Sequence, residues 1–160
     1  MRKEIVGTIS AAAKIQHDAG WLDLDSIVRV QLTSEDPAFP IENALSLNPE
    51  LNQLGWRAAS PGPQTITLLF DVAQDIRRIR LHFMEHKMER SQEFLLRYSS
   101  ANETDREIVR QQWTFSPTGS AQEIEEYTVD LRSVTKLELV LDPDRGRRDS
   151  LAVLNAFRLA

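Results

Sequence analysis

The 160-residue chain contains no cysteine. This absence excludes disulfide bonds, thiolate nucleophiles, cysteine-ligated zinc and iron–sulfur clusters. Aromatic residues make up only 7% of the chain, and no apolar run approaches the roughly 18 residues that a membrane-spanning helix needs. Basic residues are also in deficit, because 19 Lys and Arg stand against 24 Asp and Glu, for a formal net charge of −5. This balance disfavours binding to a nucleic-acid backbone, which needs clustered Lys and Arg.

The remaining composition is that of a folded domain. Apolar residues make up 41% and charged residues 27% of the chain, as in ordinary globular proteins. At about 100–200 residues per domain, the length predicts one domain. Arg2-Lys3 and the apolar stretch that follows have the order of a secretion signal, but Glu4 and Gly7 interrupt it. With no disulfides to form, the expected location is the cytoplasm.

Alternation of apolar and polar residues is the recurring signal from Val28 onward. Val28, Val30 and Leu32 alternate with polar residues, as in a strand with one buried face. Turn residues such as Pro61-Gly62-Pro63 separate the repeats of this pattern, and no long helical pattern lies between them. We therefore predict an all-β fold, an antiparallel β-sandwich of about eight strands. The predicted strands are 28–33, 66–70, 79–83, 94–98, 109–115, 127–131, 137–141 and 151–159.

Two regions lack this alternation. Residues 4–17 form either a short helix or a leading strand, and the alanines at 11–13 favour the helix. The predicted organisation is therefore an N-terminal arm or short helix over 1–25 and the sandwich domain over 26–160. Residues 34–63 form a proline-rich connection, and connections of this length are often functional.

Motifs for catalysis are weak. His82-Phe83-Met84-Glu85-His86 fits the H-x-x-E-H pattern of zinc peptidases, which requires a helix. In the predicted strand the two imidazoles would lie about 13 Å apart, too far to share one zinc ion. The sequence also has no G-x-S-x-G nucleophile motif and no glycine-rich phosphate loop. We expect neither enzymatic activity nor a cofactor.

Candidate binding residues lie in the predicted loops. Trp56, beside Arg57, either stacks on a ligand such as a sugar ring or packs into the core. The cluster Arg145-Gly146-Arg147-Arg148 is flanked by aspartates, so it is either a solvated loop or a contact for an anion or partner. Glu35-Asp36 and Asn43 carry oxygens of the kind that Ca²⁺ prefers, or they cap local turns.

Several of these segments resemble the galactose-binding-like jelly-roll superfamily, which includes discoidin (coagulation-factor type C) domains and many carbohydrate-binding modules. The resemblance covers about 28–160 and is firmest over 33–70. Residues 33–68 also resemble the N-terminal domain of the X-ray repair cross-complementing scaffold protein. The motifs that carry these resemblances are Thr33-Ser34-Glu35-Asp36, Pro40-Ile41-Glu42-Asn43-Ala44-Leu45, Gly55-Trp56-Arg57-Ala58-Ala59, Gln64-Thr65-Ile66-Thr67-Leu68 and Phe94-Leu95-Leu96-Arg97-Tyr98-Ser99.

The resemblance implies a non-catalytic module that binds carbohydrate through loops at one end of the sandwich, with Asp36 as a ligand of a structural Ca²⁺. Two alternatives stay open. One is an intracellular protein-interaction module, and the other is binding of nicked or single-stranded DNA through Arg78, Arg80, Arg97 and Arg110. The superfamily's terminal cysteine pair and membrane-inserting aromatic spikes are missing, so no membrane partner is expected. The ligand-binding residues that the resemblance implies are Glu35, Asp36, Asn43, Trp56, Arg57, Arg145, Arg147 and Arg148.

Overall fold

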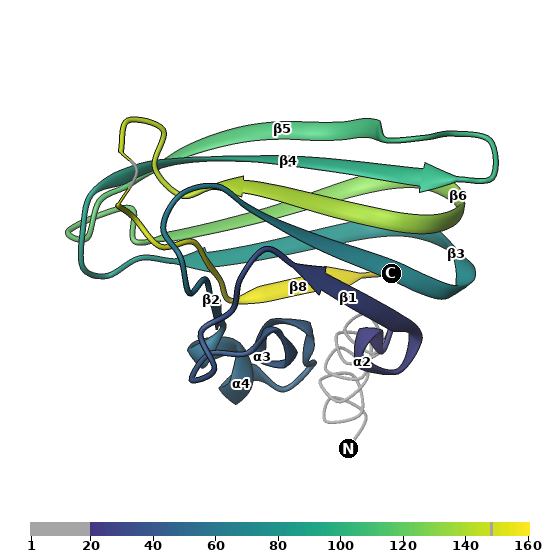
Figure 1. Ribbon diagram of the computed structural model, residues 1–160, viewed down its shortest axis with the longest axis horizontal. Coiled ribbons are helices and arrows are strands. Elements are labelled where there is room, and N and C mark those ends of the chain that lie inside the picture. The colour runs from purple at the N-terminus through teal and green to yellow at the C-terminus, as the bar shows by residue number, and fades with distance from the viewer. Residues whose placement is uncertain (1–19, 148) are drawn as a thin grey trace, which may run out of the picture.

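The computed structural model describes residues 20–147 and 149–160 (Figure 1). Most of the arm predicted over 1–25 lies outside the described residues, and its last part leads into the short helix α2. None of the helices described is long and apolar enough to cross a membrane. In chain order the elements are α2 (Leu24–Ile27), β1 (Val28–Leu32), α3 (Ile41–Leu45), α4 (Pro49–Leu54), β2 (Trp56–Arg57), β3 (Gln64–Met84), β4 (Arg90–Ser100), β5 (Arg106–Phe115), β6 (Gln122–Asp142), β7 (Val153–Leu154) and β8 (Ala156–Leu159).

The strands β3 and β6 each contain two of the predicted strands. They pair with each other along nearly their whole length, but the register shifts between Leu69 and Arg78. At this point β3 and β6 bend together, at the right of Figure 1. In β6 the bend includes Ser133, whose φ is +52°, and the Ser133 N–H donates to Asp75 Oδ1 at 2.9 Å. Each strand therefore contributes one half to each layer of the sandwich.

The pairing places five strand segments in the first layer and three in the second. The first layer has the order β1, β3 (64–69), β6 (134–142), β4 and β5, all antiparallel. The second layer has the order β6 (122–131), β3 (76–84) and β8. Apolar residues of both layers are fully buried between them, among them Ile66, Phe83, Phe94, Leu139 and Phe157. The predicted antiparallel β-sandwich is confirmed.

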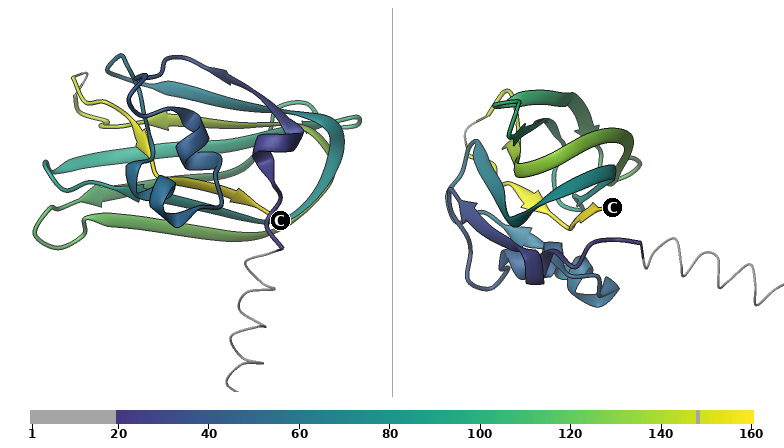
Figure 2. Two further views of the ribbon diagram at one scale, coloured as in Figure 1. Left: turned by 90° about the horizontal axis from the view of Figure 1, so that it is seen from below. Right: turned by 90° about the vertical axis from the view of Figure 1, so that its right-hand side faces the viewer.

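The short helices α3 and α4 lie together outside the two layers (Figure 2). Helix α4 begins where the Asn48 side chain accepts a hydrogen bond from the Glu50 N–H at 2.9 Å, with Pro49 in the first turn. It ends at Gly55, whose φ of +68° and ψ of −174° lie in a region that only glycine adopts readily. The chain passes from Gly55 directly into β2, which pairs with β7.

Gly55→Ala is expected to lower the free energy of unfolding by about 2 kcal/mol. The backbone conformation is strained for alanine, and the new Cβ would lie 2.9 Å from the Leu154 carbonyl oxygen. Gly119→Ala is the matched control, because a Cβ there would have no atom within 4 Å. Urea unfolding of the two variants measures the difference, and an equal stability of both would contradict the expectation.

Candidate functional site

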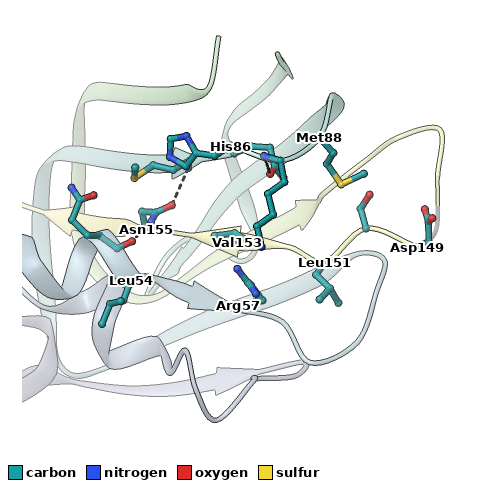
Figure 3. A pocket seen from close by; sticks show the side chains of 13 residues that line it. Leu54, Arg57, His86, Met88, Asp149, Leu151, Val153 and Asn155 are labelled. Atoms are coloured by element: carbon teal, nitrogen blue, oxygen red, sulfur yellow. Dashed lines mark hydrogen bonds between the residues drawn. The ribbon is translucent and has the colours of Figure 1, made fainter. Parts of the chain in front are cut away.

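A pocket with a volume of about 490 Å³ opens at the loop end of the sandwich (Figure 3). Four segments far apart in the sequence form it: the end of α4, strand β2, the turn between β3 and β4, and the connection from β6 into β7. The apolar side chains that line it are those of leucine, valine and methionine, and several of the polar side chains are charged. The lining residues are Gln53, Leu54, Arg57, Met84, Glu85, His86, Lys87, Met88, Asp149, Ser150, Leu151, Val153 and Asn155.

Asn155 anchors the floor of this pocket. It lies between β7 and β8 and is buried. Its Oδ1 accepts from the Met84 N–H at 2.9 Å, and its Nδ2 donates to the Asn52 carbonyl at 3.0 Å. The Asn155 N–H also donates to the carbonyl of His82 at 2.8 Å. Because these bonds join β3, α4 and the last strands, the floor is a rigid part of the fold.

Arg57 forms part of one wall and is half-buried. Its backbone is fixed on both sides, since Arg57 pairs with Val153 of β7 and its carbonyl accepts from the Asp36 N–H at 2.9 Å. The guanidinium carbon lies 4.4 Å from the centroid of the Phe39 ring, a distance at which a cation is attracted to the ring. Figure 3 places Arg57 across the pocket from His86.

Glu85 lines the pocket, but its charge is already compensated. Arg90 Nε donates to Glu85 Oε1 at 2.7 Å, and the Lys87 N–H donates to Oε2 at 3.0 Å. Burial acts to raise the pKa of Glu85, but the bonds from Arg90 and from the Lys87 and Met88 backbone outweigh it and lower the pKa. The carboxylate therefore stays ionised and serves to shape the turn that carries His86 and Lys87.

Behind Glu85, a network of hydrogen bonds between buried polar groups extends into the sandwich. Arg90 is almost fully buried, and its Nη1 donates to the Pro143 carbonyl at 2.7 Å and to Gln92 Oε1 at 3.2 Å. Gln92 Nε2 donates to Glu123 Oε1 at 2.9 Å. Burial, followed by the neighbouring Glu125, raises the pKa of Glu123 to about 8. This network fixes the turn between β3 and β4 to the interior of the domain.

Two of the predicted ligand residues are structural. Trp56 is 0% exposed and belongs to the core, so the prediction that it contacts a ligand is wrong and its alternative, core packing, is correct. Asn43 is 7% exposed, and its Nδ2 donates to the Gly55 carbonyl at 3.0 Å. A ligand has no access to either side chain, because both are buried.

Glu35 and Asp36 stabilise their own loop. Glu35 Oε1 accepts from the Ile41 N–H at 2.6 Å, at the start of α3, and Asp36 Oδ1 accepts from the Ala38 N–H at 2.9 Å. No group of three or more His, Asp or Glu side chains with the geometry of a metal site is found in the described part of the chain. The calcium ion expected at Asp36 stays a prediction.

The described residues of the predicted arginine cluster do not line the pocket. Arg145 Nε lies 3.3 Å from Glu93 Oε2, on the side of β4. Arg147 is exposed and lies two residues before the pocket residue Asp149. Arg148 lies outside the described residues. Of the predicted ligand residues that the structure describes, only Arg57 lines the pocket.

His86, Lys87 and Asn155 also line the pocket, and none of the three is among the ligand residues predicted from the sequence. The density of charged residues over 85–90 is the one signal in the sequence that points to this turn. The arginines proposed for DNA binding are instead paired with carboxylates on the same sheet faces. Arg78 and Arg80 both contact Glu126 at 3.0 Å, Arg97 contacts Glu138 at 3.2 Å and Arg110 contacts Glu93 at 2.8 Å.

Comparison with known proteins shows the fold. No protein-family model and no curated protein sequence matches the chain. Three similar solved structures are the family 32 carbohydrate-binding module of NanJ from C. perfringens in complex with galactose, that of AlyQ in complex with 4,5-unsaturated mannuronic acid, and a pectin-binding carbohydrate-binding module. Their TM-scores are 0.63, 0.60 and 0.59, at 12%, 15% and 17% identity. The matches cover 87%, 84% and 84% of this chain and 96%, 95% and 90% of the others. The chain therefore has the β-sandwich fold of these carbohydrate-binding modules, as predicted from the sequence.

Proposed function

We propose that the chain is a non-catalytic carbohydrate-binding module and that the pocket at the loop end is its binding site. The observation that carries the proposal is the mixed lining of this pocket. Arg57 and Lys87 offer charged donors, whereas Leu54 and Leu151 offer aliphatic surface and are exposed. A sugar ring needs both kinds of contact, because its hydroxyls form hydrogen bonds and its C–H face packs on apolar groups.

The shared fold supports the same proposal. Two of the similar structures hold a sugar, galactose in one and an unsaturated uronic acid in the other, and a third belongs to a pectin-binding module. The fold alone does not define a function, so the proposal depends on the pocket and its charged and aliphatic walls.

Arg57→Ala is expected to weaken binding of the preferred glycan by about tenfold to a hundredfold, the value of one or two hydrogen bonds from a charged donor. A glycan array, run once with Ca²⁺ and once with EDTA, selects the glycan and tests the proposed calcium ion. Isothermal titration with that glycan then gives the change in affinity. Arg29→Ala is the control, because Arg29 is an exposed arginine on β1 that does not line the pocket.

A blank array under both conditions would contradict the proposal and favour the protein-interaction alternative. A glycan that binds Arg57→Ala as well as it binds the wild type would place the site elsewhere on the domain.

A further inference from the structure

The cations of the pocket differ from most of the other cations that the structure describes. On the surface of this acidic domain, arginine and lysine side chains are generally paired with carboxylates. None of the described ion pairs includes Arg57 or Lys87. The cations in these pairs are Arg77, Arg78, Arg80, Arg90, Arg97, Arg106, Arg110, Arg132, Lys136 and Arg145.

The acidic groups of the pocket do not offset these two charges. Glu85 is neutralised by Arg90, which lies behind the wall at 2.7 Å. Asp149 is exposed and lies at the far side of the pocket from His86 (Figure 3). Arg147 is exposed, precedes Asp149 by two residues in the sequence and belongs to none of the described ion pairs. With Glu85 paired to Arg90, Arg57 and Lys87 outnumber Asp149, the one other carboxylate of the lining, so the pocket is positive although the net charge of the whole chain is −5.

We infer that the pocket selects an acidic sugar, a uronic acid unit within an oligosaccharide, whose carboxylate binds the Arg57 guanidinium. This inference rests on the proposed function and names its ligand class. The planar guanidinium forms two parallel hydrogen bonds to a carboxylate. Phe39 covers one face of the guanidinium, and partial burial of Arg57 reduces screening of its charge by salt. Lys87 supplies a second positive charge, and Leu54 and Leu151 contact the ring.

The test compares oligomers of galacturonic, glucuronic, mannuronic and guluronic acid with their carboxyl-reduced, neutral counterparts by isothermal titration. Each pair has the same ring stereochemistry, so only the carboxylate differs. We expect the preferred acidic oligomer to bind at least about tenfold more tightly than its neutral counterpart, the effect of one charged hydrogen-bonded pair. Its affinity falls between about 50 and 500 mM salt, whereas that of the neutral oligomer does not.

Variants of pocket residues test whether the preference for the acidic oligomer arises in this pocket. Lys87→Gln, which keeps a polar side chain at an exposed position, lowers the acidic preference severalfold, and Arg57→Ala abolishes it. Arg29→Ala leaves it unchanged, and thermal melts of all three variants confirm that they fold.

Neutral oligomers that bind as tightly as acidic ones, and that lose affinity in Arg57→Ala, would overturn the inference and leave the proposed function standing. If no glycan binds, acidic or neutral, both fail. An acidic preference that survives both Arg57→Ala and Lys87→Gln would overturn the assignment to this pocket.

Discussion

Arg90→Met is expected to lower the free energy of unfolding by about 3–5 kcal/mol, the usual cost of removing one partner of a buried ion pair. The methionine fills much of the volume against the Phe115 ring, whose centroid lies 4.6 Å from the guanidinium carbon. It supplies no donor, however, to Glu85 Oε1, to the Pro143 carbonyl or to Gln92 Oε1, which Arg90 contacts at 2.7, 2.7 and 3.2 Å. Three acceptors therefore lose their buried donor at once.

Urea unfolding followed by tryptophan fluorescence measures this loss. Arg106→Met is the matched control, because Arg106 forms an exposed pair with Glu103, and such pairs contribute only about 0–1 kcal/mol. The double variant Arg90→Met with Glu85→Gln is expected to recover part of the loss, since it removes the uncompensated charge. A loss below about 1 kcal/mol in Arg90→Met would show that the network contributes little to stability.

Glu123→Gln is expected to stabilise the domain by about 2–4 kcal/mol near pH 8 and to flatten its dependence on pH. Glu123 is fully buried, and burial raises its pKa from the usual 4.5 to about 8. Between these two values the folded state holds a proton that the unfolded state has released. The stability of the wild type therefore falls as the pH rises from about 4.5 to about 8. Glutamine resembles the protonated acid and keeps the acceptor for Gln92 Nε2.

Unfolding free energies measured at several values between pH 5 and pH 9 test this prediction. Glu89→Gln is the control, because Glu89 is an exposed residue of the turn before β4, and its substitution should leave the slope unchanged. A wild type whose stability does not change over this range, or a Glu123→Gln variant that keeps the full slope, would show that Glu123 is ionised in the folded state.

The periodicity of the sequence predicted the sandwich because most strands have one face in the core. It did not predict that 66–70 and 79–83 are two halves of one bent strand, β3. The bend depends on contacts such as that between Asp75 and Ser133, which are 58 residues apart. A local pattern contains no information about such a contact, and the same holds for the bent β6.

The pocket was predicted less completely than the fold. Trp56 and Arg57 are adjacent in β2, and neighbouring strand residues point to opposite faces, so that one enters the core and the other the pocket. The sequence indicated this segment but not which of the two residues faces the ligand. Asn155 has the appearance of an ordinary residue of the last strand, and its role arises from bonds to Asn52 and Met84, which are remote in the sequence. The cytoplasmic location expected from the sequence stays a prediction.

Asn155 holds the pocket floor, and Gly55 approaches it so closely that a Cβ at Gly55 would lie 2.9 Å from Asn155 Nδ2; this arrangement has a practical consequence for selecting new binders from this domain. The floor depends on backbone-directed bonds and on one glycine conformation, so these two positions must be kept in any library of variants. Residues 86–88 and 149–151 lie in connecting loops outside the strand ladders. Randomising these loop positions would therefore diversify the ligand-facing surface while leaving the strand pairing of the sandwich unaltered.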